Sequence, residues 1–355
     1  MMMDSSPTRY RMLPVHVIEH RGGAILKRGS LETRIGGERA LEILRRIVEE
    51  AREGAPLERL REPFTEAERP TIDHLLKQLV ERRLLVPTDE WPADGDTPEG
   101  IFYWEFGQDA GAVRSRLREA RLVIVGVNEI TRELNRVLLR SGFEQMVVVD
   151  YPAFRNLRLF GDEGALDQRA WGEPPPMSLA EWQESATTDS VDCLIATSDH
   201  GGLHWMRQWN QFCAENRLNF FPVVLQNQIG YIGPYIIPGE TACFECVRAR
   251  QNSHLDRPEE ERAFEAVASE AQDVVGFHPA MSGAVANVAA MALVNLFSRT
   301  LPFTPVASLI ELNLVVPRMV ARKVLRIPNC AVCRTMWENA SVSPYRDEMM
   351  PGNRE

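Results

Sequence analysis

Two pairs of cysteines with the same short spacing constrain this chain more than any other feature. Cys243 and Cys246 form one Cys-x-x-Cys pair, and Cys330 and Cys333 form the second. A two-residue spacer lets a tight turn direct both sulfurs at one tetrahedral ion, and two such turns fill the four positions around Zn²⁺. A filled shell leaves no position for a catalytic water. We therefore predict a structural zinc site held by these four thiolates.

Disulfide bonds and redox chemistry are the alternatives for these cysteines. Disulfides are not expected, because the polar segment from Met1 to Tyr10 lacks the apolar core of a secretory signal and predicts a cytoplasmic protein. A redox site needs only one Cys-x-x-Cys pair. The other two cysteines, Cys193 and Cys213, lie in an apolar run and in a helical stretch, where ordinary buried thiols are expected.

Composition and charge exclude several kinds of function. With 355 residues, 44% of them hydrophobic and 25% charged, the chain is typical of a soluble globular protein of two or more domains. The net charge of -10 argues against a nucleic-acid partner, because such proteins are usually basic. The apolar stretch 276–297 is nearly long enough to cross a bilayer, but it contains His278, Asn287 and Asn295. We predict a buried helix there and no membrane partner.

Residues 8–88 are predicted to form a small N-terminal domain. Alternating residues in 15–35 indicate three short strands, and the apolar spacing between residues 40 and 86 indicates three short helices. Three strands followed by three helices predict a winged helix-turn-helix. Residues 89–111 include a polar, turn-rich stretch and are predicted to form a linker.

Residues 112–340 are predicted to form a larger α/β domain, followed by a polar tail at 341–355. Strands and helices alternate in this region, as expected for a parallel sheet covered by helices. A βαβ unit is formed by a strand at 121–126, a helix at 129–139 and a strand at 146–150. Further strands are expected at 192–197, 221–225, 231–237, 308–316 and 319–325, with a loop at 161–190 and a charged helical segment at 254–272.

The turn after the first strand of the βαβ unit is a degenerate phosphate-binding loop. Glycines in such a turn let phosphates approach the backbone at a helix N-terminus. Only Gly126 remains, because Asn128 and Thr131 stand at the other two glycine positions, and Glu129 adds negative charge. Asp150, at the end of the second strand, has two interpretations: it holds a ribose hydroxyl, or it caps the next turn.

The region from about 112 to 340 resembles the ThiF/E1-like adenylating proteins. Six segments carry the resemblance in the family's order: Asp150 with Asn156-Leu157-Arg158, Thr197-Ser198-Asp199, Arg207 to Cys213, Gly230 to Pro234, and the two cysteine pairs. The resemblance implies a Rossmann-type domain with structural zinc that forms a homodimer. It also implies that Asp199 acts with Mg²⁺ and is the catalytic residue if adenylation is retained, and that the ATP contacts are Gly126, Asp150, Asn156, Arg158 and Asp199.

Departures from this family predict that adenylation is not retained. Active members use a lysine just beyond the Asn-Leu-x-Arg segment to stabilise the adenylation transition state, but no lysine lies between Lys77 and Lys323. An arginine fork does not replace an ammonium point charge. The charged segment 254–272 also has no cysteine that could form a thioester. We favour a noncatalytic subunit with a vestigial ATP site; the alternative is an ATP-dependent enzyme that adenylates a carboxylate or amide of a bound peptide.

The N-terminal domain resembles the precursor-recognition element of ribosomally synthesised, post-translationally modified peptides, and a small carrier-like protein of pyrroloquinoline quinone biosynthesis. Fused to a ThiF-like domain, this element is similar to leader-peptide binders that deliver a precursor to a YcaO-type cyclodehydratase, which forms azolines and thiazoles and holds the ATP. The resemblance therefore implies two partners, a precursor leader peptide and a YcaO-type enzyme. DNA binding is the alternative for a winged helix, and the acidic chain disfavours it. Activation of a ubiquitin-like sulfur carrier leaves the N-terminal domain unexplained.

The resemblance also places the leader peptide. It implies that the leader adds a β-strand to the edge formed by residues 31–35 and inserts side chains toward the facing helix. Arg34, Lys77, Arg82 or Arg83 would be available to acidic leader residues. The apolar helix positions have a simpler interpretation as core residues. The residues predicted to contact the leader are Leu31, Thr33, Arg34, Ile35, Ile72, Leu76 and Leu79.

Overall fold

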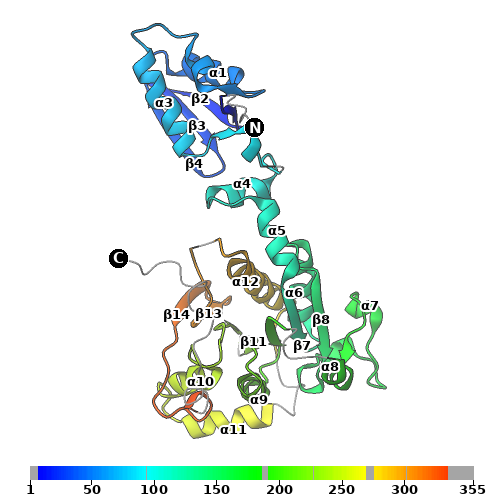
Figure 1. Cartoon of the computed structure of the whole chain (residues 1–355). Coiled ribbons are helices and arrows are strands. Elements are labelled where there is room, and N and C mark those ends of the chain that lie inside the picture. The colour runs from blue at the N-terminus through cyan, green and yellow to red at the C-terminus, as the bar shows by residue number, and fades with distance from the viewer. Residues whose placement is uncertain are drawn as a thin grey trace, which may run out of the picture. The chain divides into compact units, whose positions relative to one another are not determined.

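A computed structural model of the chain describes residues 7–92, 94–185, 191–226, 228–268, 276–300 and 302–334. The chain divides into two compact units, Met1–Val113 and Arg114–Glu355 (Figure 1). The polar tail predicted at 341–355, and the end of the helical segment predicted at 254–272, lie outside the described residues.

Unit 1 contains the three strands that the alternating pattern predicts. They are β2 (His16–His20), β3 (Gly23–Arg28) and β4 (Leu31–Gly36), and they form an antiparallel sheet in the order β2-β3-β4. The chain reverses at Gly22 and Gly29, where φ is 79° and 56°; glycine adopts these left-handed values without steric cost. β4 is an edge strand of this sheet. Among the described residues, β3 is its one partner strand, so its other edge is unpaired.

Three helices pack on this sheet and complete the small domain. They are α1 (Ala40–Glu50), α2 (Leu57–Arg61) and α3 (Arg69–Glu81). Leu44 and Ile47 of α1 are fully buried with Leu79 of α3, because the apolar residues of each helix recur at helical spacing on its inner face. A second small sheet was not predicted, since strands of two to four residues show no period: it consists of β5 (Ala55–Pro56), β1 (Arg9–Met12) and β6 (Leu85–Pro87).

The segment predicted as a linker contains regular structure. It begins with the 3-10 turn η1 (Thr88–Glu90) and includes α4 (Pro98–Glu105) and the start of α5 (Ala110–Glu119). The Thr97 hydroxyl caps α4 by accepting a hydrogen bond from the Gly100 amide. A threonine cap followed by proline is a helix-start signal that the turn-rich composition concealed. Trp104 donates to the Arg83 carbonyl at 2.8 Å, so α4 is attached to the rest of unit 1.

Unit 2 is built on a mixed eight-stranded sheet with the order β14-β13-β12-β11-β10-β7-β8-β9 (Figure 1). Five strands, from β11 to β9 in that order, pair in parallel, whereas β12, β13 and β14 are antiparallel. The strands are β7 (Arg121–Val125), β8 (Gln145–Asp150), β9 (Met177–Ser178), β10 (Cys193–Ser198), β11 (Phe220–Gln226), β12 (Ile229–Ile232), β13 (Ser308–Asn313) and β14 (Arg318–Lys323).

Two sequence predictions for this unit are corrected. The strand predicted at 231–237 ends at Ile232, because Pro234 has no N–H to donate to the ladder; beyond it, Ile236 pairs with Phe220 of β11 in an isolated bridge. The loop predicted at 161–190 contains short regular elements, namely α7 (Gln168–Trp171), β9 and α8 (Leu179–Ser185). Four to seven residues are too few to show a helical period.

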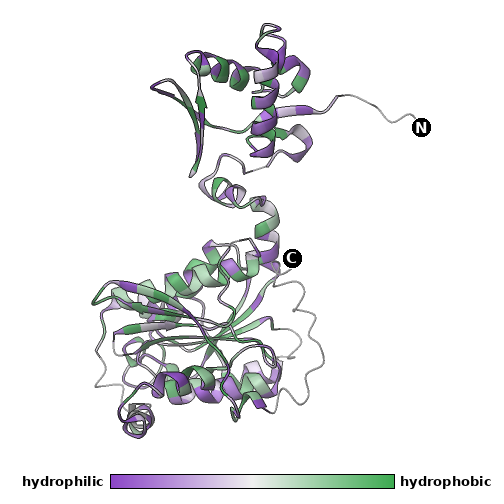
Figure 2. Cartoon of the chain, turned by 90° about the vertical axis from the view of Figure 1, so that its left-hand side faces the viewer, coloured by the Kyte–Doolittle hydropathy of each residue, from purple (hydrophilic) through white to green (hydrophobic). Residues whose placement is uncertain are grey.

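Helices cover both faces of the sheet, and apolar strands lie between them (Figure 2). α6 (Glu129–Arg140) packs against α12 (Pro279–Ser298), and α12 also contacts β11 and β12. α9 (Leu203–Glu215) packs on β10 and β11 and contacts α10 (Phe244–Asn252) and α11 (Pro258–Ala268). This is the layered arrangement that alternating strands and helices predict.

α12 covers the apolar stretch for which the sequence predicts a buried core helix and not a membrane span. Among the described residues it is the one helix with the length and composition of a membrane span, with a mean hydropathy of 1.6. Half of that window is buried, and Val285, Ala289 and Leu293 are fully enclosed. A buried core helix accounts for its apolar character.

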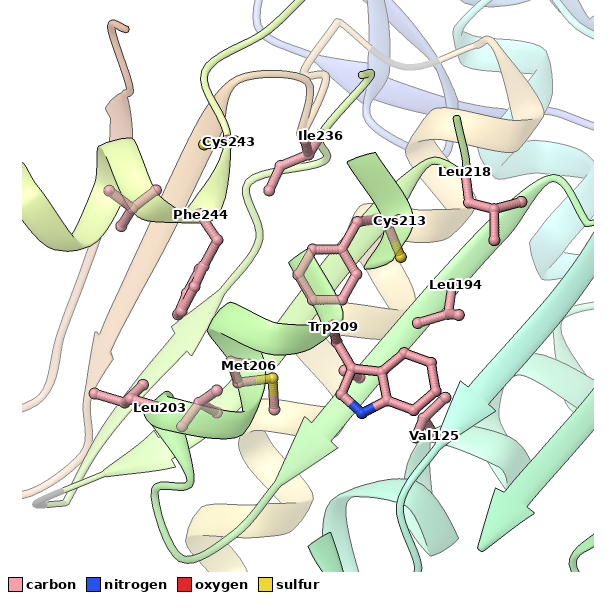
Figure 3. Close-up of a cluster of buried hydrophobic side chains, with 14 of the residues drawn as sticks. Val125, Leu194, Leu203, Met206, Trp209, Cys213, Leu218, Ile236, Cys243 and Phe244 are labelled. Atoms are coloured by element: carbon pink, nitrogen blue, oxygen red, sulfur yellow. The ribbon is translucent and has the colours of Figure 1, made fainter. Parts of the chain in front are cut away.

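Of the two cysteines outside the Cys-x-x-Cys pairs, Cys213 belongs to the core around α9 (Figure 3). Cys213 packs with Trp209 and Leu218, and Cys193 lies on the central strand β10. Burial raises the pKa of both thiols, so they stay neutral and apolar at physiological pH. The prediction of ordinary buried thiols is confirmed.

Candidate functional site

Three strand ends meet at one edge of the unit 2 sheet and bring together residues that are far apart in sequence. Gly126 follows β7, Asp150 ends β8, and Asp199 follows β10. β7 lies between β8 and β10, so the chain order reverses at this edge, which is where nucleotides bind in open α/β sheets. We call Gly126, Asn128, Asn156 and Asp199 the Asp199 corner, since they surround the start of α6.

The turn after β7 is filled by the side chain of Asn128. Its Oδ1 accepts a hydrogen bond from the Thr131 amide at 3.0 Å, and its Nδ2 donates to the Phe154 and Thr197 carbonyls at 3.1 and 3.0 Å. Asn128 is fully buried. A Cβ on Gly126 would lie 2.8 Å from the Thr197 carbonyl oxygen, so the turn is tightly packed. The side chain fills space that a phosphate-binding loop keeps open with glycine.

Asp199 places its own carboxylate at the start of α6. Its Oδ2 accepts from the Glu129 amide, the first residue of the helix, at 3.0 Å, and from Asn156 Nδ2 at 2.8 Å. The His200 ring nitrogen Nδ1 lies 3.4 Å from its Oδ1. Asp199 is 1% exposed. A helix N-terminus attracts one anion, and in this protein Asp199 is that anion, at the place where a phosphate would bind.

The other residues predicted for a nucleotide are placed around this corner. Asp150 accepts two hydrogen bonds from the Arg155 fork, at 2.8 and 2.6 Å, so an arginine of the following loop holds its carboxylate. This pairing raises the pKa of Arg155. Arg158 is exposed, and its backbone amide donates to the Asn156 side chain at 3.1 Å. Glu129 forms an ion pair with Arg132.

Arg207, the first residue of one segment that carries the family resemblance, is engaged in ion pairs. It pairs with Glu245 of α10 and lies 3.6 Å from Glu265 of α11, which is itself paired with Arg248. These four charges connect three helices. Their mutual pairing accounts for Arg207 without a ligand.

The four cysteines come together in one buried cluster. Their sulfur atoms all lie within 4.8 Å of one another. The Cys243 sulfur is 3.9 Å from that of Cys246 and 3.6 Å from that of Cys330, and the sulfurs of Cys246 and Cys333 are 3.6 Å apart. A tetrahedral zinc with Zn–S bonds of about 2.3 Å requires sulfur separations of about 3.8 Å. The cluster therefore fits a structural Zn²⁺ ion.

Local structure places the first cysteine pair. Cys243 is the N-cap of α10 and Cys246 lies in the first turn, where the helix dipole favours thiolates. The Phe244 amide donates to Asn210 of α9 at 2.9 Å, which fixes this turn against the core. Hydrogen bonds from Cys243 and Cys333 lower the pKa of Cys246 to about 2, and its bond to Cys246 raises the pKa of Cys243.

A groove lies beside the free edge of β4 in unit 1, with a volume of about 550 Å³. It runs between the end of β4 and the outer face of α3. We call it the β4 groove. Of the residues predicted to contact a leader peptide, three line it, namely Arg34, Ile35 and Ile72.

The other predicted contact residues do not line the β4 groove. Leu76 and Leu79 are core residues, which is the alternative that the sequence analysis gave for the apolar positions of this helix. Leu31 packs against that core. Thr33 is buried and accepts a hydrogen bond from Arg82 at 2.8 Å, which fixes the distance between β4 and the end of α3. Leu75 lines the groove and was missed, although it follows Ile72 at the i, i+3 spacing of one helix face.

Comparisons with known proteins give the fold. No family model and no curated protein matches the sequence. Among solved structures, E. coli MccB with MccA-N7isoASN matches 92% of this chain and 99% of its own at 15% identity, with a TM-score of 0.65. The microcin C7 biosynthetic enzyme MccB in complex with N-formylated MccA matches the same shares at 16% identity and a TM-score of 0.64.

Two further solved structures are similar to this chain. E. coli MccB with ATP matches 92% of this chain and 99% of its own at 15% identity, with a TM-score of 0.62. The heterocyclase TruD matches 92% of this chain but 43% of its own, at 17% identity and a TM-score of 0.58. At these identities the likeness establishes the fold alone. The predicted fold class, an α/β domain preceded by a small N-terminal domain, is confirmed, and its mixed eight-stranded sheet is like that of MccB.

Proposed function

We propose that this chain binds the leader of a ribosomally synthesised, post-translationally modified peptide and delivers the precursor to a YcaO-type cyclodehydratase, without using ATP itself. The observation that carries the binding half is the β4 groove. An edge strand offers backbone donors and acceptors, and the adjacent groove of about 550 Å³ takes side chains that project from an added strand. MccB, whose fold this chain shares, was solved in complex with N-formylated MccA, and TruD is a heterocyclase.

The groove has the chemistry that an extended peptide requires. Ile35 and Leu75 supply apolar surface on its two sides, and Arg34 is exposed at the strand. Thr33 and Arg82 hold the strand and helix at a set spacing, so the peptide meets a preformed site. Side chains at alternate positions of the leader would face the groove, and an acidic leader residue would pair with Arg34.

The noncatalytic half of the proposal is supported by the Asp199 corner. The carboxylate that would act with Mg²⁺ accepts hydrogen bonds from the Glu129 amide and from Asn156. Binding a triphosphate at this helix start would require displacement of that buried anion, or close approach of like charges. The zinc that we assign to the cysteine cluster stabilises the fold and takes no part in a reaction, because its four ligands fill the shell.

The leader site is tested with the leader of the precursor encoded beside this chain's gene. Fluorescence anisotropy with the full chain should show saturable binding, and Ile35→Asp should weaken it by about 100-fold, because a charge replaces the apolar contact at the centre of the site. Ile18→Asp is the matched control: Ile18 is exposed on β2, the opposite edge strand, and its substitution should leave affinity unchanged. Equal affinities for the wild type and Ile35→Asp would remove the β4 groove from the proposal.

The role of ATP is tested separately. Calorimetric titration of the full chain with Mg·ATP should give no saturable heat, with or without the precursor. A YcaO-type partner should modify the precursor faster in the presence of this chain, and Ile35→Asp should raise the precursor KM of that reaction with little change in kcat. Pyrophosphate release that depends on this chain and on the precursor would establish the adenylating alternative instead, with Asp199 as its magnesium ligand.

We also propose a homodimer. α12 is rich in small residues, and its outward positions include Asn287 and Met291, of which Met291 is 42% exposed. Small residues allow close approach of a second helix. Sedimentation equilibrium should give twice the chain mass of 40.2 kDa, and a single-chain mass would contradict the proposal.

A further inference from the structure

A second cavity lies in unit 2, between the C-terminal half of α10 and the antiparallel end of the sheet. Its volume is about 490 Å³, within the range of small-ligand sites. Its lining comes from α10, β12, β13 and β14 and from the residues just after α10 and β14. None of the residues of the Asp199 corner lines it. We call it the α10 cavity.

The sheet side of the α10 cavity carries a defined set of side chains. Tyr231 pairs with Glu311, and Leu309 pairs with Arg322, across neighbouring antiparallel strands. Directly opposed residues, and residues two apart on a strand, share a face, so these four side chains lie on the face of the sheet that lines the cavity. Val247 of α10 adds a buried apolar surface on the other side.

Basic groups outnumber acidic ones around the α10 cavity. Arg250, Arg322 and Lys323 line it together with His254, against the single carboxylate of Glu311. Arg322 donates through Nε to Glu311 at 3.2 Å, and Arg250 donates to the carbonyls of residues 325 and 326. Lys323 is one of three lysines in the chain, and it is exposed. A basic cavity in a chain of net charge -10 favours an anionic ligand.

Asn252 supplies a second, independent indication of a ligand. It lines the cavity at the end of α10 and is 3% exposed, yet neither its Nδ2 nor its Oδ1 has a hydrogen-bond partner among the described residues. Leaving a buried amide unpaired is costly, and native structures do so rarely. A residue in an extended peptide presents its backbone N–H and C=O on the same side of the chain, and these are the two partners that this side chain lacks.

We propose that the α10 cavity binds a short acidic peptide segment. The backbone N–H and C=O of one extended residue pair with the Asn252 amide, an apolar side chain of the segment packs on Val247 and Leu309, and a carboxylate reaches Lys323 at the rim. The site lies in the larger unit and uses no residue of the β4 groove, so it goes beyond leader binding. It would give the protein a second contact with a peptide.

The test uses the full chain and two synthetic tetrapeptides, acetyl-Gly-Leu-Glu-Gly-amide and acetyl-Gly-Leu-Gln-Gly-amide. Calorimetric titration should show saturable millimolar binding of the Glu peptide and weaker binding of the Gln peptide. Asn252→Leu removes both polar atoms at similar side-chain volume, and it should lower the affinity for the Glu peptide by about tenfold. Lys323→Gln should weaken it by about threefold and abolish the preference for Glu over Gln.

Controls separate this site from folding effects and from the leader site. Asn252→Leu should keep or raise the Tm, since it removes two unpaired buried atoms. Lys77→Gln changes another exposed lysine and should leave tetrapeptide binding unchanged, as should Ile35→Asp in the β4 groove. No saturable binding by the wild-type chain, equal binding of the two peptides, or unchanged binding by Asn252→Leu would each overturn the proposal. Loss of tetrapeptide binding in Ile35→Asp would show that these peptides bind at the leader site instead.

Discussion

The Asp199 corner and the β4 groove use their polar groups in opposite ways. In the corner, Asp199 accepts hydrogen bonds from Asn156 and from the Glu129 amide, Asn128 accepts one from the Thr131 amide, and all three side chains are buried. In the groove, the outer edge of β4 has no partner strand among the described residues, and Ile35 and Arg34 face open volume. A polar cluster that satisfies itself stabilises the fold, whereas an open edge remains available to a ligand.

This comparison predicts that substitutions in the two regions affect different quantities. Changes that disturb unit 2 should alter stability and leave leader affinity intact. Changes at the β4 groove should do the reverse. Differential scanning calorimetry and leader anisotropy, applied to the same variants, measure the two quantities.

The largest expected effect comes from the cysteine cluster. Cys243→Ser removes one thiolate, and since structural zinc contributes about 10 kcal/mol or more of folding energy, unit 2 should lose its cooperative transition. Metal analysis should give one zinc per wild-type chain and none in the variant, and the unit 1 transition and leader affinity should persist. Cys213→Ala, which changes a buried thiol outside the cluster, should keep its zinc. Full zinc content in Cys243→Ser would contradict the assignment.

Asp199→Asn should reduce stability by about 2 kcal/mol, because it removes the negative charge at the start of α6. The asparagine oxygen can still accept from the Glu129 amide and from Asn156, but a neutral oxygen accepts more weakly than a carboxylate does. The unit 2 transition should move to lower temperature while leader affinity stays constant. Asp162→Asn, an exposed carboxylate of the same unit, is the control and should have no effect. An unchanged unit 2 transition in Asp199→Asn would mean that the corner is not a stabilising cluster.

Arg34→Glu should act on binding alone. Arg34 is exposed at the β4 groove, so reversing its charge should lower the affinity for an acidic leader by about tenfold, equivalent to about 1.4 kcal/mol of binding free energy. The Tm should not change. The loss should shrink as salt is raised, because exposed charges are screened. Arg45→Glu on the outside of α1 makes the same charge change away from the groove and should not alter affinity. An equal loss in both variants would indicate a nonspecific charge effect.

The effect on stability that is smallest at neutral pH comes from the buried thiols of unit 2, because it appears only in alkaline solution. Burial raises the pKa values of Cys193 and Cys213 above those of the unfolded chain, so the stability they contribute is complete below the unfolded pKa and is lost as pH rises above it. Above about pH 9, each thiol should cost about 1.4 kcal/mol per pH unit. Urea unfolding of the Cys193→Ala/Cys213→Ala variant should show a flatter decline than the wild type between about pH 9 and 10. Parallel declines would assign the loss to other groups.

The elements of this fold follow from the sequence wherever a run is long enough to show its period. The three strands between residues 15 and 36, the helices α1, α3 and α12, and the βαβ unit of β7, α6 and β8 all lie where the pattern predicts them. The short elements β1, β5, α7 and α8 were missed because runs of two to seven residues are too short to show a period. α4 was missed although Thr97 and Pro98 mark its start, since the turn-forming residues around them carried more weight.

Site predictions succeeded where sequence spacing controls the distance between side chains. The paired cysteines meet because each pair sits in one tight turn. The predicted leader contacts divide between groove and core, because spacing along α3 does not reveal which part of the helix face β4 covers: Ile72 is buried and also lines the groove, whereas Leu76 and Leu79 are buried in the core and do not line it.

The sequence by itself determined the two-part organisation, the α/β class and a four-cysteine cluster, because periodicity and short spacings are local properties of a chain. It also showed that the phosphate-binding turn had lost glycines. Only the tertiary structure decided what replaced the phosphate, since Asp199, Asn156 and Glu129 come from separate segments that meet when three strands align. Which polar groups satisfy one another, and which stay open as in the β4 groove, depends on distances that folding alone sets.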